Sequence, residues 1–133
     1  MSFIENIKKR AKQDIKTIVL PESNDIRVIK ATSKILKEGF ADIILIGNKK
    51  EILDLANKND VDITQAKIIE PLKSDKFSKY ATDFYELRKN KGMTLNKAKE
   101  IMKDNVYFGM MMVKEGDADG LVSGACHSTA DTL

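Results

Sequence analysis

The sequence predicts an α/β fold of three layers (α/β/α), in which helices cover both faces of a mainly parallel sheet. Four short apolar runs, near residues 17–20, 43–46, 67–69 and 120–123, have the composition of buried strands. Amphipathic segments of helical length separate them. Strands that alternate with helices are joined by crossover connections, which make neighbouring strands parallel. A mainly antiparallel sheet, or a helix at residues 43–46, would contradict this prediction.

The composition is that of one ordinary globular domain. The chain has 133 residues, of which 42% are hydrophobic and 32% charged, so it can bury a sizeable core. Its net charge is only +3 and its lysines are spread along the chain, which argues against a nucleic-acid partner. The single cysteine, Cys126, excludes an internal disulfide. No secretory or membrane-spanning run is present, so we expect a cytoplasmic protein without a membrane partner.

The first segments follow the α/β pattern. An amphipathic N-terminal helix is predicted by four apolar residues at helical spacing, Phe3, Ile4, Ile7 and Ala11. After the strand at 17–20, Pro21 ends the run, and one of Ser23, Asn24 and Asp25 caps a helix that Gly39 ends. The turn at residues 21–23 lies at the carboxyl end of a strand, where open α/β sheets bind ligands. A purely structural turn is the alternative.

The middle of the chain repeats the pattern. Gly47 and Asn48 turn the strand at 43–46 into a helix over 49–57, and Pro71 closes the strand at 67–69. A helix over 75–90 then carries one apolar stripe, made by Phe77, Tyr80, Ala81, Phe84 and Leu87.

Arg88 falls inside that apolar stripe, where an unpaired buried charge would be costly. Two interpretations follow from the helical angles. The side chain either extends past the edge of the core and complements the helix dipole, or it reaches a cleft and binds an anion with its planar guanidinium. If the second holds, we expect the guanidinium to face the segment from Ser123 to Thr129.

Two more helices are predicted before the last strand. Thr94 caps a short helix that runs to Lys103, and Gly92 ends the helix before it. Residues 105–113 are apolar almost all round, which is typical of a helix buried on several sides. We expect it to pack beneath the sheet or against a part of the protein outside this chain, with its methionines filling the core.

The last sixteen residues, ADGLVSGACHSTADTL, combine a short strand, a glycine turn and the polar start of a helix. The free amides and the dipole of a helix N-terminus attract anions, and the hydroxyls of Ser128 and Thr129 add donors there. A plain helix cap is the alternative interpretation. No second histidine and no cysteine pair accompany Cys126 and His127, so no metal site is predicted. The Walker and dinucleotide-binding glycine patterns are also absent.

Three blocks of the sequence resemble the phosphate acetyltransferase family: GLVSGACHSTADTL, IVLPESNDIRVIKA and ELRKNKGMT. The resemblance implies that residues 1–133 are the N-terminal α/β domain, itself incomplete, of a two-domain acyltransferase whose second domain is absent from the chain. It implies transfer of an acetyl group between coenzyme A and inorganic phosphate, with acetyl phosphate as the other substrate. It also implies direct attack by the coenzyme A thiolate, no bound cofactor and a homo-oligomer.

The matched motifs imply a substrate site in which Arg88, Ser128 and Thr129 clamp the phosphate, while Ser123 and Gly124 shape the loop. The family's base and most of its coenzyme A surface are implied to lie in the second domain. No catalytic residue is therefore assigned within this chain, and the chain alone is expected to be inactive. The alternatives are a phosphate butyryltransferase, an acyltransferase-like domain fused to another enzyme, or a non-catalytic binding or interaction module.

Overall fold

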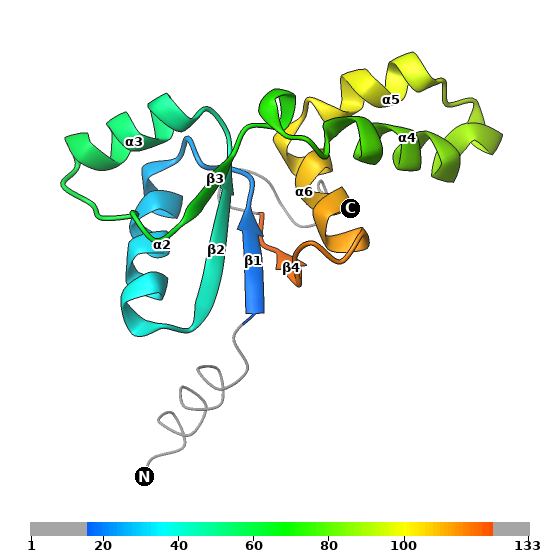
Figure 1. The fold of residues 1–133 in the computed structure, drawn as a ribbon. Coiled ribbons are helices and arrows are strands. Elements are labelled where there is room, and N and C mark those ends of the chain that lie inside the picture. The colour runs from blue at the N-terminus through cyan, green and yellow to red at the C-terminus, as the bar shows by residue number, and fades with distance from the viewer. Residues whose placement is uncertain (1–15, 124–133) are drawn as a thin grey trace, which may run out of the picture.

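The structure, a computed structural model, describes residues 16–123, and its centre is a parallel sheet (Figure 1). The strands are β1 (Lys16–Leu20), β2 (Ala41–Ile46), β3 (Lys67–Ile69) and β4 (Gly120–Leu121). Their order is β3-β2-β1-β4, and every pair is parallel. The prediction of the fold and of the four strands is confirmed. Only β4 is shorter than expected, because its pairing with β1 is confined to Ile18 and Val19.

The helices begin and end close to the predicted residues. They are α2 (Ile26–Glu38), α3 (Lys49–Lys58), α4 (Phe77–Arg88), α5 (Leu95–Met102) and α6 (Asn105–Lys114). The predicted helix over 75–90 is shorter, since its end becomes the 3-10 turn Lys89–Lys91. The predicted N-terminal helix lies outside the described residues.

Local capping explains most of these boundaries. Asp25 caps α2 by accepting a hydrogen bond from the Arg27 amide at 2.9 Å, and Thr94 caps α5 in the same way. Gly39 ends α2 in the left-handed region at φ 70°, which a residue with a Cβ rarely adopts. These contacts use neighbouring residues only, so the sequence predicted the cap at Thr94 and the stop at Gly39. It left the cap of α2 open among Ser23, Asn24 and Asp25.

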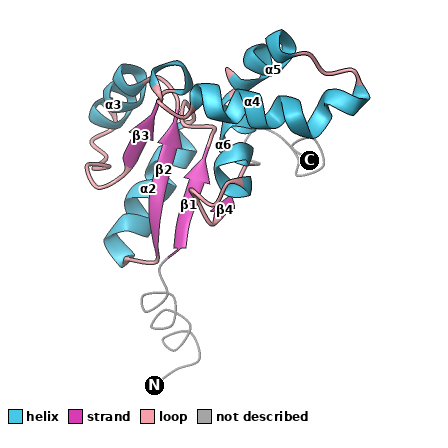
Figure 2. Cartoon of the chain, turned by 45° about the vertical axis from the view of Figure 1, so that its right-hand side comes forward, coloured by secondary structure: helices cyan, strands magenta, loops and turns pink. Residues whose placement is uncertain are grey.

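The crossovers place helices on both faces of the sheet (Figures 1 and 2). From β1 to β3 the chain moves steadily toward one edge, and α2 and α3 pack on one face. The long return from β3 to β4 carries α4, α5 and α6 over the other face. Right-handed crossovers require this arrangement of the helices. When the chain reverses its direction along the sheet, the connecting helices come to lie on the opposite face.

The side chains of alternate strand residues pack into two separate cores, one on each face of the sheet. Leu20, Ile43 and Leu45 point to the face under α2 and α3, where they meet Ile29 and Ile52. We call this the aliphatic face. The opposite face carries Val19, Ile44 and Ile46 against the aromatic and methionine side chains of the other helices, namely Tyr80, Phe84, Met102, Phe108, Met111 and Met112. We call it the aromatic face.

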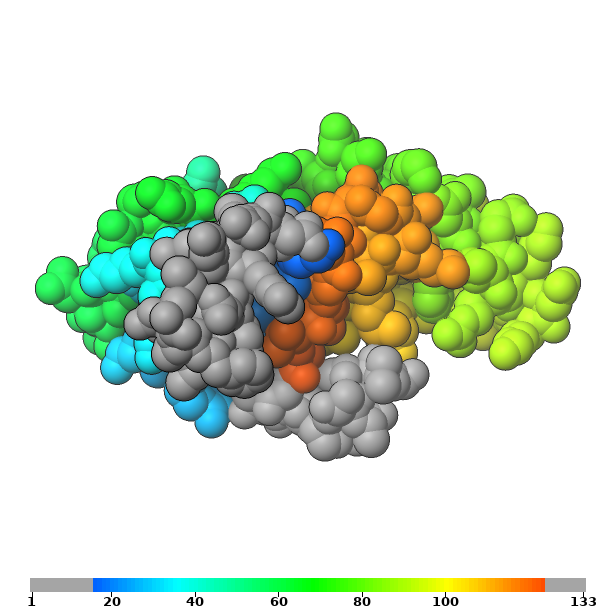
Figure 3. Space-filling model, turned by 90° about the horizontal axis from the view of Figure 1, so that it is seen from below, coloured from blue at the N-terminus to red at the C-terminus, as the bar shows by residue number. Residues whose placement is uncertain are grey.

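Helix α6 approaches the sheet very closely at Gly109. A Cβ placed there would lie 2.8 Å from Leu121 Cδ1, 3.1 Å from Val19 Cγ1 and 3.2 Å from Ile46 Cδ1. Figure 3 shows α6 and β4 side by side. The helix is therefore buried on the sheet side, as one of the two expectations had it. Its other side is not covered within residues 16–123, since Tyr107 is 41% exposed.

Candidate functional site

The strand order reverses between β1 and β4. The chain lays down β1, β2 and β3 in one direction and then returns to pair β4 with the free side of β1. In open α/β sheets, ligands bind outside the carboxyl ends of the strands at such a point. The residues that follow β1 and β4 are therefore the first candidates for a site.

Two loops meet at these carboxyl ends. Glu22 and Ser23 follow β1 and are 8% and 1% exposed. Ser123, two residues beyond β4, donates its hydroxyl hydrogen to Oε1 of Glu22. Ser23 donates its own hydroxyl to the Leu20 carbonyl at 2.8 Å, which fixes the turn against the end of β1.

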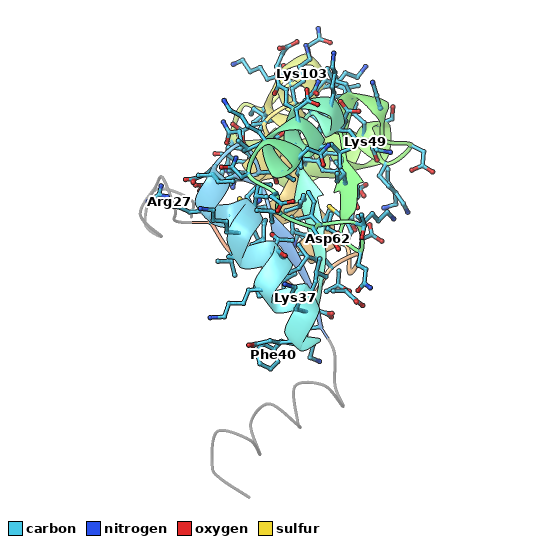
Figure 4. All side chains as sticks on the ribbon, turned by 90° about the vertical axis from the view of Figure 1, so that its left-hand side faces the viewer. Arg27, Lys37, Phe40, Lys49, Asp62 and Lys103 are labelled. Carbon is cyan, nitrogen blue, oxygen red and sulfur yellow. The ribbon has the colours of Figure 1, made fainter. Side chains whose placement is uncertain are left out.

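Arg27 lies in the first turn of α2, next to these loops. Figure 4 shows its side chain projecting away from the helix, and it is 68% exposed. Its guanidinium forms an ion pair with Asp25, with 2.7 Å between Nη2 and Oδ2. The carboxylate of Asp25 thus both caps α2 and orients Arg27.

Arg88 and Ser123 line one groove of about 800 Å³ between α4, α6 and the end of β4. Most of its other lining residues are apolar: Phe84, Leu87, Tyr107, Met110, Met111, Val113, Leu121 and Val122, with Lys114 beside them. Arg88 is exposed, and its guanidinium carbon lies 5.4 Å from the centre of the Phe84 ring, the geometry of a cation–π contact.

This geometry contains features of both interpretations of Arg88. Tyr80, Ala81 and Phe84 are buried, so the stripe does face the core. One turn later, Arg88 extends past the core edge over the Phe84 ring and reaches the groove. A guanidinium held against a ring keeps its N–H groups free at the rim, where they can meet an anion.

A second groove, of about 620 Å³, lies on the other side of α4, at the edge strand β3. Its walls mix lysines and carboxylates, and Lys73 is already paired with Glu70 at 3.3 Å. The Tyr80 hydroxyl there donates to the Asp117 carboxylate. Burial, followed by this bond, raises the pKa of Tyr80 above its ordinary value, so the phenol stays protonated and does not act as a base.

The structure brings two of the predicted site residues together. Arg88 and Ser123 share a groove, while Gly124, Ser128 and Thr129 lie outside the described residues. Their roles in binding substrate remain predictions. No group of three or more His, Cys, Asp or Glu side chains within residues 16–123 is arranged to hold a metal ion. The same stretch has no helix that is long and apolar enough to cross a membrane.

The sequence did not predict a role for one site residue, Glu22. The turn at residues 21–23 was weighed as a ligand site or a structural turn, but Glu22 was not assigned a partner. An acidic residue directly after a buried strand was the available signal. Its partner follows β4, 101 residues later, so only the fold could identify it.

The model of the family described as phosphate acetyl/butaryl transferase matches residues 2–133. The chain belongs to this family. It is 62% identical over 133 residues to a phosphate acetyltransferase of Thermoanaerobacterium thermosaccharolyticum. It is 57% identical, again over 133 residues, to one of Acetivibrio thermocellus. In both cases the match covers 100% of this chain and 40% of the relative.

Solved structures agree with the sequence comparison. A phosphotransacetylase from Streptococcus pyogenes superposes with a TM-score of 0.88 at 38% identity, over 99% of this chain and 41% of that one. For the EutD phosphotransacetylase from Staphylococcus aureus the TM-score is 0.87 at 36% identity, over 97% of this chain and 39% of that one. The chain therefore spans about two fifths of the length of these phosphate acetyl/butaryl transferase relatives.

Proposed function

We propose that this chain is the N-terminal α/β domain of a phosphate acetyltransferase. The enzyme would transfer an acetyl group between coenzyme A and inorganic phosphate. The observation that carries the proposal is that Arg88 and Ser123 line one groove, beside the point where the strand order reverses, in a chain of this family. Relatives that match the whole chain bear the name phosphate acetyltransferase, which favours acetyl over butyryl as the acyl group.

The proposed chemistry is a direct acyl transfer. The coenzyme A thiolate attacks the carbonyl carbon of acetyl phosphate, a carbon–sulfur bond forms, and the carbon–oxygen bond to phosphate breaks. Phosphate leaves with the electron pair, and the thiol proton goes to a base. Within this chain, the Arg88 guanidinium would bind the phosphate oxygens in a bidentate manner. Ser128 and Thr129 would add donors, with Gly124 allowing the turn that brings them near.

Orientation of the substrate follows from the walls of the groove. The cation–π contact holds the Arg88 guanidinium beside a surface that is apolar apart from Lys114 and Ser123. An acyl phosphate has an anionic end and an apolar end, so the groove would orient it with the phosphate at Arg88. Correct orientation of reacting groups removes much of the barrier of a two-substrate reaction.

The proposal also includes a cytoplasmic enzyme that needs no bound cofactor and works as a homo-oligomer. Coenzyme A, acetyl-CoA, phosphate and acetyl phosphate are its small-molecule partners. The apolar residues left exposed around the groove, Leu87, Tyr107 and Val122, support a further contact surface here. Analytical ultracentrifugation of the complete protein would test the oligomer.

The activity can be tested by completing the chain. We would join residues 1–133 to the remaining part of the Thermoanaerobacterium thermosaccharolyticum relative, and refer to this as the completed enzyme. It should form acetyl-CoA from acetyl phosphate and coenzyme A faster than it forms butyryl-CoA from butyryl phosphate. The 133-residue chain alone should show no turnover. A stable, folded completed enzyme without acyl transfer would refute the proposal, and a preference for butyryl phosphate would favour the butyryltransferase alternative.

The role of Arg88 has its own test in the completed enzyme. Arg88→Lys replaces a bidentate fork with a point charge, so the KM for acetyl phosphate should rise about 10-fold or more. The control is Lys89→Ala, which removes a neighbouring cation that is paired with Glu86 at 2.7 Å and does not line the groove. If Arg88→Lys leaves the kinetics unchanged, the role of Arg88 is structural.

A further inference from the structure

Glu22 is a buried carboxylate for which the proposed reaction has no use. It is 8% exposed and lies at the carboxyl end of β1. Burial of a charge is costly unless hydrogen bonds compensate for it. The chain nevertheless places Glu22 here and gives it the Ser123 hydroxyl as a donor.

The backbone around Glu22 is fixed on both sides. The Glu22 carbonyl accepts a hydrogen bond from the Asp25 amide at 3.3 Å, and the neighbouring Ser23 hydroxyl is bonded to the Leu20 carbonyl at 2.8 Å. Asp25 in turn caps α2. A carboxylate on so rigid a turn can define the position of whatever it binds.

One partner of Glu22 is Ser123, the residue that begins the predicted phosphate segment. Val122 still pairs with the sheet, since its amide donates to the Val19 carbonyl at 3.0 Å. Ser123 comes next, and its side chain bonds Glu22 across the gap between β4 and the β1–α2 turn. The backbone therefore has its last described tie to the sheet at Val122, and the side chain of Ser123 adds one more.

This contact determines what Ser123 can do for a substrate. A serine hydroxyl has one hydrogen to donate, and here Glu22 accepts it. A phosphate placed against Ser123 would also face the Glu22 carboxylate, and like charges repel each other. Ser123 is thus a poor donor to phosphate, and the anion is better placed at the Arg88 end of the groove.

We propose that Glu22 is a positioning residue, which accepts the Ser123 hydroxyl and thereby fixes where the chain leaves the sheet after Val122. Ser123 then serves as an anchor at the end of β4 and does not contact the phosphate. The inference deepens the proposed function and rests on it.

A double-mutant cycle in the completed enzyme tests the pair. Glu22→Leu removes the acceptor, Ser123→Ala removes the donor, and the third variant combines both. Each single change should lower kcat/KM for acetyl phosphate about 10-fold, the size expected for a hydrogen bond to a charged group. The losses in the double variant should be smaller than the product of the two single losses, because the contact between Glu22 and Ser123 is already absent from each single variant.

Glu22→Gln separates this positioning role from a role of the charge itself. A glutamine keeps an oxygen that can accept the Ser123 hydroxyl, so this variant should retain most of the activity and an unchanged pH profile. Two results would overturn the inference. One is a double variant whose loss of kcat/KM equals the product of the two single losses, and the other is a Glu22→Gln enzyme as impaired as Glu22→Leu.

The same double-mutant cycle can also be measured through protein stability, which does not require catalytic activity. In the 133-residue chain, the urea midpoints of the variants should also be non-additive, with Glu22→Gln close to the wild type. Additive shifts would count against the pair even if the completed enzyme were inactive. An inactive wild-type completed enzyme would count against the proposed function alone, so the two failures can be told apart.

Discussion

The two faces of the sheet are built from the same strands but are covered in different ways. The aliphatic face uses branched side chains and one helix per crossover, with Ile29, Ile43 and Leu45 at its centre. The aromatic face receives three helices from a single return of the chain, and half of the buried residues in its core are aromatic residues or methionines. Phe108 packs edge-to-face on Tyr80, with ring centres 5.0 Å apart.

The faces also differ in how much apolar surface they leave open. The groove of about 800 Å³ that holds Arg88 lies on the aromatic face. A smaller groove of about 360 Å³, lined by residues such as Ile18, Val28 and Ile35, lies on the aliphatic face. Both reach Val122 and Ser123, so residues 16–123 leave an open groove on each side of β4. The comparison indicates that the aliphatic face mainly stabilises the sheet, whereas the aromatic face combines a core with the candidate site.

The largest expected effect is the loss of a central side chain from either face. Phe108→Ala should lower the free energy of unfolding by about 3–5 kcal/mol, and Ile29→Ala by about 2–5 kcal/mol, because both side chains are fully buried. They belong to separate clusters, so their effects should add in the double variant. Urea denaturation followed by circular dichroism measures all three.

Leu72→Ala is the control for that pair, since Leu72 is 68% exposed and should change stability little. A strongly non-additive double variant would contradict the description of two independent cores. It would mean that the sheet transmits packing changes from one face to the other.

The next effect concerns the close approach of α6. Gly109→Val should destabilise the chain by about 1–3 kcal/mol, because the added side chain overlaps with Leu121, Val19 and Ile46. Lys114→Val is the control, since it places the same side chain at an exposed position of the same helix. If both variants have the same urea midpoint, the helix can move outward and the groove wall is less rigid than proposed.

The smallest effect is the loss of one polar contact on the aromatic face. Tyr80→Phe removes the bond to Asp117, and because Asp117 is exposed to solvent the loss should cost only about 0.5–1.5 kcal/mol at neutral pH. Burial raises the pKa of Tyr80 in the folded state. Its contribution is therefore complete below the unfolded pKa of about 10, and it declines as the pH rises from there through the folded value.

Urea midpoints measured from neutral pH to a pH of about 11 check that sign. The stabilities of wild type and Tyr80→Phe should converge progressively as the pH rises. A constant difference across the range would show that the Tyr80 hydroxyl contributes by packing alone.

Local patterns in the sequence were enough to predict the helices, the strands and the parallel sheet. Apolar runs predicted the strands, and the cap at Thr94 and the stop at Gly39 predicted helix ends, because these features depend on neighbouring residues. For the start of α2 the sequence offered three caps, and the structure identifies Asp25. The sequence also singled out Arg88, since a charge inside an apolar stripe conflicts with burial. The resemblance of three blocks to the phosphate acetyltransferase family added the family, which the comparison confirms.

Contacts between residues far apart in the sequence became visible only in the folded chain. Ser123 finds Glu22 across 101 residues, and Tyr80 finds Asp117 across 37. The place of β4 beside β1 brings Arg88 and Ser123 to one groove, and it requires a glycine where α6 crosses the sheet. Such contacts depend on strand order, register and the packing of distant helices. No local pattern of side chains encodes them, because the free energy that selects them comes from burial of the whole core.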